Sequence, residues 1–274
     1  MVYPNCATPP RHAYSYPMAI NQLGKADTAR WLVALWFVGA TLVAAMCPLL
    51  TSAQIASACV TGRPNQTGSW SAGVDGMGYS GYVLGGIYGR VEQVPVTIPT
   101  TNYPGVVAWV MLLSSDAQSW AQIGWASSIQ NGRETFSQVK ESGYFHTYFN
   151  SPPVDSQYPY FTVFYNNTPG KFTFQVDNNW WTPRGSGGYQ PPANFVPYEG
   201  NAGGEITNLA NQLPGTVAAP AGFFDLHVFA AGGWLSGGGY MQSIDQTKFG
   251  TDPALGQAPY YNTQAYIWDK ACAS

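Results

Sequence analysis

Short apolar runs recur along the chain between residues 82 and 268, and several of them alternate with polar residues. In residues 171–177, for example, Phe172, Phe174 and Val176 alternate with polar or charged side chains. Successive side chains of a β-strand point to opposite faces, so this alternation predicts a strand with one buried face. The runs that we predict as strands are Tyr82–Leu84, Arg90–Ile98, Val106–Leu113, Ala121–Ser127, Thr135–Val139, Tyr144–Phe149, Tyr160–Tyr165, Lys171–Val176, Gly204–Asn208, Phe223–Phe229 and Tyr266–Trp268.

These runs are separated by Gly, Pro and Asn turns such as residues 166–170, and they show no helical periodicity. Such a pattern predicts an all-β fold of two packed antiparallel sheets. Three segments lack the pattern. We expect residues 59–78 to be a lead-in segment, and the Gly/Pro/Asn-rich residues 182–203 and 232–264 to be long surface loops that shape a binding cleft.

The composition supports this fold class. The chain has 274 residues with 31 Gly, 21 Pro, 10 Trp, 18 Tyr and 13 Phe, and only 9% of its residues are charged. Helical bundles draw instead on Ala, Glu, Lys and Leu. A hydrophobic fraction of 45% with a net charge of −3 argues against a disordered chain. A pI near 5.5 without a Lys/Arg cluster argues against nucleic-acid binding.

The N-terminal part has the pattern of a secretory signal. Residues 31–50 form an apolar run that follows Lys25 and Arg30 and precedes a small-x-small site at residues 56–58. We expect cleavage near Ala58, a secreted, extracellular protein, and no membrane contact after cleavage. The run is also long enough to span a bilayer, so an uncleaved anchor stays open. Initiation at Met18 instead of Met1 stays open as well.

Cleavage near Ala58 would leave two cysteines, Cys59 and Cys272, at opposite ends of the mature chain. An exported chain with two cysteines predicts a disulfide between them. Such a bridge would stabilise the fold by about 4 to 5 kcal/mol on the chain-entropy model. The alternative for Cys59 is a lipoprotein attachment site.

Length predicts one domain in the exported part. The segment after residue 58 is long enough for one large β-sandwich and too short for two independent domains. We therefore expect an N-terminal extension and signal peptide in residues 1–58, the lead-in in residues 59–78, and a β-sandwich domain in residues 79–274. The sequence leaves open whether the lead-in is a removable pro-segment.

Several kinds of chemistry lack their residue patterns. His146 and His227 have no ligand-spaced partners, so we expect no metal site and no cofactor. No Gly-x-Ser-x-Gly motif, no clustered glycosidase carboxylates and no phosphate-binding Gly/Lys loop occur. Two polar residues in predicted strands remain. Gln122 lies between two tryptophans, and Glu205 follows a pair of glycines; either is also compatible with the exposed face of an alternating strand.

Residues 79 to 230 resemble the glutamic peptidases of the eqolisin family. Residues 79–86 are similar to the family's opening Trp-x-Gly-x-Val strand, and residues 88–99 to its second strand ending in Val-Pro. Ala108-Trp109-Val110 resembles its Ala-Trp-Val-Gly-Ile strand, and Ala121-Gln122-Ile-Gly124 its Leu-Gln-x-Gly motif. Tyr144–Phe149 takes the place of its aromatic Trp-Tyr-Glu-Trp-Tyr strand.

A second resemblance concerns the neprosin family. Gly203-Gly-Glu205-Ile is similar to its Trp-Gly-Gly-Glu-Val segment, and Gln122-Ile-Gly-Trp125 to its Glu-Ala-Gly-Trp. Both families are two-sheet sandwiches of the concanavalin A-like (jelly-roll) type that cleave peptides at acidic pH. The resemblance therefore implies an acid endopeptidase that acts on polypeptides.

The resemblance also assigns roles to residues. Glu205 would be the general base that activates a water and returns the proton to the leaving amine, and Gln122 would donate its amide hydrogen to the oxyanion. Trp109, Trp125 and Tyr144 would bind the substrate. If the alignment slips by three residues, Asn208 takes the catalytic position and the protein is inactive; whether Glu199 replaces Glu205 stays open.

The alternative function is a non-catalytic sandwich that binds carbohydrate or peptide. After residue 58 the chain has eight Lys and Arg against 13 Asp and Glu, so few positive charges repel one another once acid protonates the carboxylates. Such a chain should tolerate low pH, which suits a secreted acid peptidase and a lectin equally. We expect a monomer whose partner is a polypeptide substrate, with a glycan as the alternative.

Overall fold

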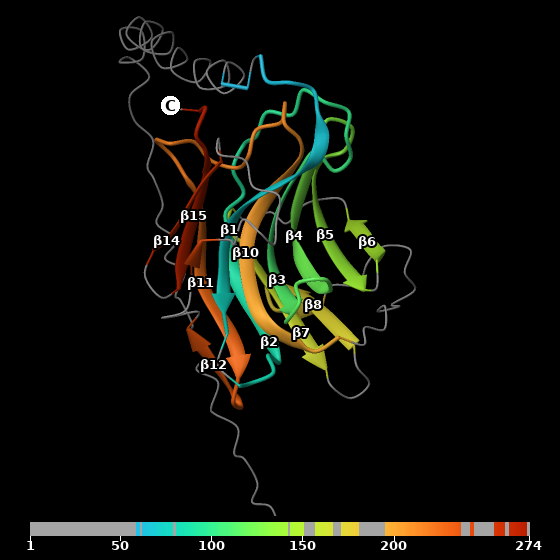
Figure 1. Cartoon of the computed structure of the whole chain (residues 1–274), viewed down its shortest axis with the longest axis vertical. Coiled ribbons are helices and arrows are strands. Elements are labelled where there is room, and N and C mark those ends of the chain that lie inside the picture. Colours follow the sequence, from blue (N-terminus) through green and yellow to red (C-terminus); the bar gives the residue numbers. More distant parts are fainter. Residues whose placement is uncertain are drawn as a thin grey trace, which may run out of the picture. The chain divides into compact units, whose positions relative to one another are not determined.

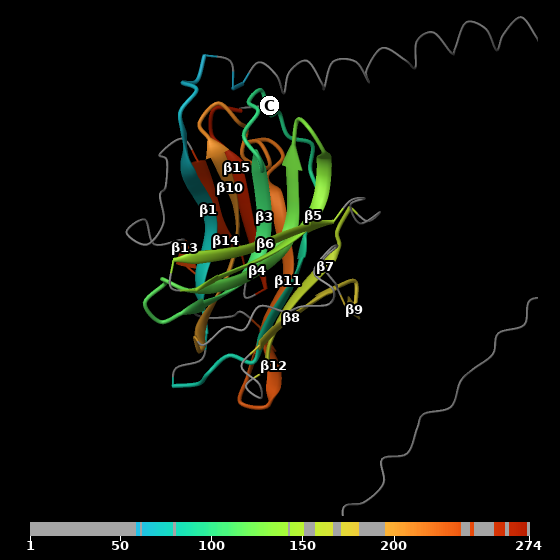
Figure 2. The same cartoon turned by 90° about the vertical axis from the view of Figure 1, so that its right-hand side faces the viewer.

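The computed structural model describes residues 59–60, 62–78, 81–141, 143–150, 157–166, 171–180, 195–236, 242–243, 255–260 and 263–272. Every regular element in these segments is a β-strand, and the strands form two antiparallel sheets (Figures 1 and 2). The signal segment and the turn at residues 167–170 lie outside the described residues. The all-β, two-sheet fold predicted from the alternation is confirmed.

The first sheet has seven strands. Their order across the sheet is β13 (Gln242–Ser243), β1 (Thr67–Met77), β10 (Pro197–Asn208), β3 (Val106–Ser114), β4 (Trp120–Ser128), β5 (Gly132–Glu141) and β6 (Tyr144–Asn150). The strands that follow one another in sequence, β3 to β6, are joined as consecutive antiparallel neighbours. β10 inserts between β3 and β1, which brings three distant parts of the sequence together.

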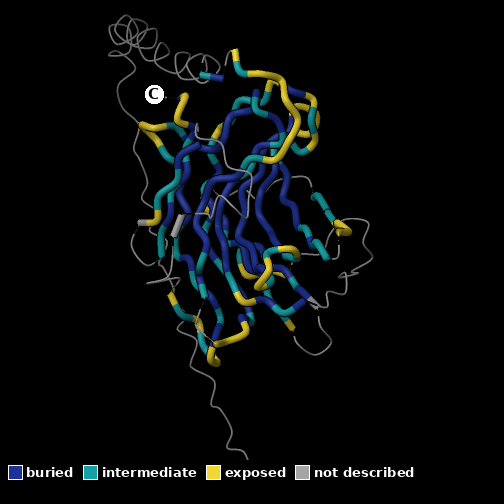
Figure 3. The backbone as a smooth tube through the Cα atoms, viewed as in Figure 1, coloured by how far each residue is buried: buried dark blue, intermediate teal, exposed yellow. Residues whose placement is uncertain are grey.

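The second sheet packs against the first. Its order is β14 (Leu255–Tyr260), β15 (Gln264–Asp269), β11 (Ala221–Ala230), β2 (Gly86–Val91), β7 (Tyr160–Asn166), β8 (Lys171–Val176) and β9 (Asn179–Trp180), and β12 (Gly233–Ser236) pairs with β11. With β12 included, this second sheet has eight strands. Buried positions run through the middle of both sheets, and exposed positions gather in the connections (Figure 3).

The core lies between the sheets and follows the strand alternation. On β3, Ala108, Val110 and Leu112 belong to this core, while Trp109 and Met111 point to the opposite side of the sheet. All of Val106–Leu113 is nevertheless buried. The outward side of β3 is covered by a second, smaller apolar cluster, which explains why the sequence of β3 is continuously apolar instead of alternating.

The structure differs from the predicted elements at the lead-in segment. Residues 59–78, where we expected no strand, contain β1, which pairs with β10 along most of its length. Its sequence is rich in Gly, Ser and Ala, and it lies beside equally small residues: Gly73 is opposite Gly203, and Ala72 opposite Gly204. Small residues have low strand propensity, so the alternation signal is weak there. Removal of this segment would expose an edge of β10.

Other boundaries also differ. β10 starts at Pro197, inside a predicted loop, and β12, β13 and β14 lie in the segment 232–264 that we predicted as a loop. Residues 82–84 and 92–98 form no strand, although both were predicted to. The predictions for β3 to β8, β11 and β15 are confirmed to within a few residues. The prediction fails mainly where glycine and proline interrupt a strand.

The predicted disulfide is confirmed. Cys59 and Cys272 are bonded, with their Cα atoms 4.8 Å apart, so the bridge joins the start of the described chain to its end. Nearby, Arg63 forms an ion pair with the fully buried Asp269. Asp269 also accepts a hydrogen bond from the backbone N–H of Leu213 at 3.2 Å. The segment before β1 is therefore fastened to the C-terminal part of the domain.

Candidate functional site

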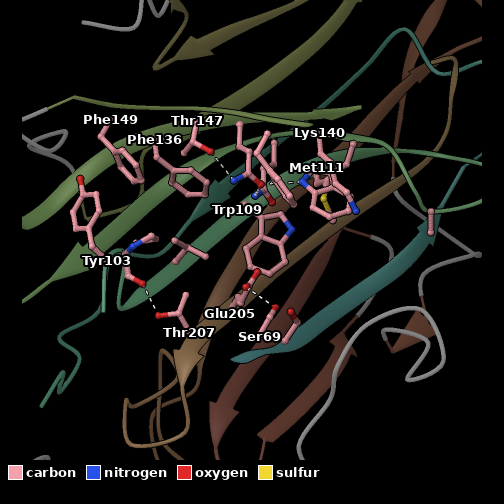
Figure 4. Close-up of a pocket in the computed structure, with 18 of the residues that line it drawn as sticks. Ser69, Tyr103, Trp109, Met111, Phe136, Lys140, Thr147, Phe149, Glu205 and Thr207 are labelled. Atoms are coloured by element: carbon pink, nitrogen blue, oxygen red, sulfur yellow. Dashed lines mark hydrogen bonds between the residues drawn. The ribbon is translucent and has the colours of Figure 1, made fainter. Parts of the chain in front are cut away.

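A cleft of about 670 Å³ opens on the outward face of the first sheet, the face directed away from the core. Side chains from β1, β10, β3, β4, β5 and β6 line it, together with the connection at Tyr103 and Pro104 (Figure 4). Aromatic rings form most of its walls: Tyr103, Trp109, Trp120, Phe136, Phe145 and Phe149. A cleft with apolar walls and few polar groups is typical of a binding or active site. We call it the cleft.

Trp109 occupies the middle of the cleft because its neighbours across the sheet are glycines. It lies opposite Gly203 of β10 and Gly124 of β4. A Cβ atom at Gly203 would lie 2.5 Å from the carbonyl oxygen of Ala72, so no larger residue fits without a shift. Trp109 is only 2% exposed, and its Nε1 has no hydrogen-bond partner within the described residues. An unsatisfied buried donor that lines a cleft is a candidate contact for a ligand carbonyl.

Glu205 lies on one side of Trp109. β10 directs its side chain into the cleft, where the Ser69 hydroxyl of β1 donates a hydrogen bond to Oε1 at 2.6 Å. Glu205 as a whole is half-buried. Its removal from bulk water raises the pKa of Glu205, and the Ser69 hydrogen bond opposes part of that rise. A carboxyl group with a raised pKa in a cleft is a candidate acid–base group.

Gln122 lies on the other side of Trp109, in a network of side-chain amides. It is 6% exposed, and its Nε2 donates to Gln138 Oε1 at 2.9 Å. The same oxygen accepts a hydrogen bond from Trp120 Nε1 at 3.0 Å, and Gln138 Nε2 donates to Thr147 Oγ1 at 2.8 Å. These contacts fix the orientation of the Gln122 amide and leave its second N–H for a ligand.

The structure brings Gln122 and Glu205 to one cleft but not into contact. Gln122 is opposite Met111 of β3, whereas Glu205 is opposite Val107, four residues away on the same strand. From standard strand spacings, their Cα atoms are separated by about 14 Å along the strands and about 10 Å across them. The Trp109 ring lies between Glu205 and the Thr147 end of the network (Figure 4). At this separation the two side chains do not meet at one peptide bond, as the roles that the resemblance assigns to them would require.

Two residues that the resemblance assigns to substrate binding lie elsewhere. Trp125 is in the core between the sheets, where its Nε1 donates to the carbonyl oxygen of Glu92 at 3.0 Å. Alternation on β4 explains this, because Gln122 and Trp125 are an odd number of residues apart and point to opposite faces. Tyr144 is 75% exposed on β6 and does not line the cleft; its neighbour Phe145 does. Trp109 alone of the three is placed as expected.

Neither alternative to Glu205, Glu199 or Asn208, lines the cleft. Glu199 belongs to the same face of β10 as Glu205 but is opposite Leu113, outside the residues that line the cleft. Asn208 is fully buried, and its amide nitrogen donates to Asn65 Oδ1 at 2.7 Å. Asn208 therefore points away from the cleft, and Glu205 is the carboxyl group that lines it.

Sequence reasoning missed several cleft residues. Trp120, Gln138 and Thr147 complete the amide network, and strand alternation from Gln122 would have indicated Trp120. Ser69 gave no signal because its segment was not predicted as a strand. Lys140 also lies in the cleft, with Nζ 4.1 Å from the centroid of the Trp120 ring and 5.4 Å from that of Phe145. This cation is at the Gln122 end, away from Glu205.

No group of three or more His, Cys, Asp or Glu residues within the described segments is arranged to hold a metal ion. His227 instead stacks on Tyr88, with ring centroids 4.8 Å apart, and its Nδ1 lies 2.8 Å from the carbonyl oxygen of Asp225. Within the part of the chain that the structure describes, no helix is long and apolar enough to cross a membrane.

No protein-family model and no curated protein matches this sequence. Among solved structures, the chain is similar to Scytalido-glutamic peptidase bound to a peptide-based transition-state analog, at 9% identity and a TM-score of 0.48, with 74% of this chain and 100% of that chain covered. It is similar to SCP-B, a member of the eqolisin family of peptidases in complex with the tripeptide Ala-Ile-His, at 10% identity and a TM-score of 0.40, with the same coverage. It is also similar to a Bacillus licheniformis beta-glucanase, at 11% identity and a TM-score of 0.33, with 46% of this chain and 55% of that chain covered. At these identities and TM-scores the likeness carries no conclusion about the activity.

Proposed function

We propose that the cleft binds an extended polypeptide and cleaves it at acidic pH, with Glu205 as the acid–base group. The observation that carries this proposal is the Glu205 carboxyl group, which lines an aromatic cleft with a raised pKa and a hydrogen bond to Ser69. The resemblance of residues 79 to 230 to glutamic peptidases supports the same position from the sequence.

In this mechanism the ionised Glu205 removes a proton from a water molecule, and the oxygen of that water attacks the carbonyl carbon of the substrate. The protonated Glu205 then returns the proton to the nitrogen of the leaving amine, so no other acid is needed. Both forms of the carboxyl group take part. Because its pKa is raised, the two forms coexist at a higher pH than for an ordinary glutamate.

Hydrogen-bond donors along the cleft would bind carbonyl groups of the substrate. The unpartnered Nε1 of Trp109 and the free N–H of Gln122 lie in the same cleft as Glu205. The resemblance assigns Gln122 to the oxyanion. The separation of Gln122 from Glu205 favours a different carbonyl, one that is bound but not under attack. Loss of such a contact raises KM and leaves kcat unchanged, whereas loss of an oxyanion donor lowers kcat about 10²- to 10³-fold.

The test is digestion of a denatured protein across pH 2 to 7 by the secreted, purified chain. We expect Glu205→Gln to lower kcat/KM by about 10²-fold or more. The matched control is Glu199→Gln, on the same strand and face but outside the cleft, which should leave the rate unchanged. Gln122→Ala should raise KM. Cleavage that survives in Glu205→Gln, or is lost in Glu199→Gln, contradicts the assignment.

A second candidate is a non-catalytic cleft that binds a glycan or a peptide. The separation of Gln122 from Glu205 and the aromatic walls favour it, because rings and amides recognise a ligand without chemistry. Absence of cleavage at every pH by a folded chain, together with binding of the denatured protein that Trp109→Phe weakens, would support this candidate over the peptidase.

We further propose that the chain is exported, acts as a monomer and folds as one domain in which β1 (Thr67–Met77) joins residues 79–274 as an integral strand. The disulfide between Cys59 and Cys272 supports export, since such bonds persist in oxidising compartments. Mass spectrometry of the secreted protein would find an N-terminus near residue 59, and sedimentation would find one copy. An N-terminus after residue 78 would contradict the role of β1.

A further inference from the structure

A second cavity of about 380 Å³ lies on the outward face of the second sheet, formed by β2, β7, β8 and β12. It shares no lining residue with the cleft. Four aromatic residues, Tyr88, Tyr160, Phe164 and Trp234, line it together with three polar ones, Thr162, Gln175 and Asn178. We call it the outer pocket. Nothing in the proposed peptidase mechanism uses it.

The rings of the outer pocket are arranged around Trp234. Its ring centroid is 4.7 Å from that of Tyr88 and 5.8 Å from that of Phe164, both in edge-on geometry. Gly86 makes room for the indole, since a Cβ atom there would lie 3.0 Å from Trp234 Cη2. The Trp234 side chain keeps 37% of its surface exposed. The sheet therefore presents an aromatic surface that is held in place by its neighbours and is still accessible.

The charged groups at this pocket neutralise one another. Arg90 Nε and Asp225 Oδ2 form an ion pair at 3.1 Å, and the Tyr160 hydroxyl donates to the same oxygen at 2.9 Å. The Arg90 guanidinium also lies 4.4 Å from the Tyr160 ring centroid. Asp225 has a φ of 52°, and the pairing register shifts between Phe224 and His227, so a bulge in β11 presents its carboxylate to Arg90. A pocket with paired charges suits an uncharged ligand.

Three polar side chains of the outer pocket are available to a ligand. The side-chain amides of Gln175 and Asn178 and the hydroxyl of Thr162 make no hydrogen bond with any other described residue. The register places Thr162 opposite both Tyr88 and Gln175, so these groups lie in one row across β2, β7 and β8. Amides and hydroxyls beside exposed rings offer both the donors and the acceptors that a polyhydroxylated ligand requires.

We propose that the outer pocket is a binding site for a neutral carbohydrate, with the sugar ring against Trp234 and its hydroxyls bonded to Gln175, Asn178 and Thr162. The C–H face of a pyranose is apolar and packs on an aromatic ring, while its rim carries the hydroxyls. The volume fits one or two sugar units. A site on the opposite side of the sandwich from the cleft would hold the protein on a glycan while the cleft stays open.

The experiment is titration of the full secreted chain with cellohexaose, laminarihexaose and chitohexaose, followed by tryptophan fluorescence and calorimetry. We expect at least one of these neutral oligosaccharides to bind, Trp234→Ala to weaken binding at least tenfold, and Gln175→Ala to weaken it severalfold. Gln175→Ala changes a side chain with no hydrogen bond to other described residues, so it tests the site even if Trp234→Ala folds poorly.

Two controls separate this site from the rest of the molecule. Tyr144→Ala removes an exposed aromatic residue of the first sheet, and Glu205→Gln changes the cleft; both should leave oligosaccharide binding unchanged. Binding that is lost in Glu205→Gln would move the sugar into the cleft and overturn the proposal. Absence of binding to all three oligosaccharides, or binding to phosphatidylcholine vesicles in their place, would overturn it as well.

Discussion

The cleft and the outer pocket are both built on the outward face of a sheet, yet they treat charge in opposite ways. In the cleft, Glu205 has no cationic partner among the described side chains, and its burial raises its pKa while the hydrogen bond from Ser69 opposes part of that rise. In the outer pocket, Asp225 is paired with Arg90 and accepts a hydrogen bond from Tyr160. Aromatic walls therefore accompany a carboxyl group with a raised pKa in the cleft and a neutralised ion pair beside the outer pocket.

The two sites also depend on different parts of the fold. The cleft depends on β1, which follows the Cys59–Cys272 disulfide and brings Ser69 to Glu205. The outer pocket depends on β2, β7 and β8, which lie on the other sheet. Loss of the disulfide should therefore destabilise the cleft more than the outer pocket. Four predictions test this contrast, in order of decreasing effect.

The largest effect is expected from the double variant Cys59→Ser with Cys272→Ser. Loss of the bridge should lower the free energy of unfolding by about 4 to 5 kcal/mol, because the unfolded chain regains the entropy of a loop of over two hundred residues. Denaturant unfolding measures the total. Hydrogen exchange should show that β1 amides lose more protection than those of β7 and β8; equal losses would break the comparison between the two sites.

The second prediction compares the stability lost when the main tryptophan of each site, Trp109 or Trp234, is replaced. Trp109→Ala removes an indole that is 2% exposed in the second apolar cluster, so we expect a loss of about 3 to 5 kcal/mol. Trp234→Ala removes one that is 37% exposed, so we expect about 1 kcal/mol. Chemical denaturation of both variants decides. A loss at Trp234 as large as that at Trp109 would make the outer pocket a structural cluster instead of a binding surface.

Much of this arrangement could be predicted from the sequence, and the failures have physical causes. Alternation within a run identified Lys171–Val176 and most other strands, because each carries its own pattern of buried and exposed positions. β1 was missed because Gly, Ser and Ala produce no such pattern even though Ala72 and Val74 are buried. The disulfide was predictable because the other two cysteines precede the expected cleavage site.

The site was predicted only in part. Gln122, Glu205 and Trp109 do line one cleft, but the register between β10 and β3 joins segments about ninety residues apart, and no local pattern encodes it. That register is what separates Gln122 from Glu205. The resemblance assigned Trp125 to substrate binding, although positions 122 and 125 are an odd number of residues apart and therefore face opposite sides of a strand. The outer pocket was not predicted, because its rings come from three separate strands, β2, β7 and β12.

The third prediction concerns the pH dependence of stability. The folded-state pKa of Glu205 is raised above its unfolded value. Its contribution to stability is therefore fully present below the unfolded pKa and is lost as pH rises through the folded one. Glu205→Gln should remove this part of the pH dependence and be more stable than the parent chain near neutrality.

Thermal unfolding from pH 3 to 8 measures this change. The matched variant Asp225→Asn removes a paired carboxylate of the outer pocket and should instead destabilise the chain near neutrality, since Arg90 loses its partner. If Glu205→Gln were as destabilising at pH 7 as Asp225→Asn, the two carboxyl groups would be equivalent and the contrast between the sites would fail.

The smallest effect is expected from Ser69→Ala. The Ser69 hydroxyl lowers the pKa of Glu205 by donating to its carboxylate, so its removal should move the pH-dependent loss of stability to higher pH. Ser69→Ala should lower the free energy of unfolding by about 0.5 kcal/mol at a pH where Glu205 is ionised, because the ionised carboxylate needs the donor. At pH 3, where the carboxyl group is protonated, the loss should be close to zero. The control is Ser71→Ala, on the same face of β1 and directly opposite Glu205 in register. A pH profile that shifts equally in both variants would mean that general polarity of the cleft, and not the hydrogen bond from Ser69, sets the protonation of Glu205.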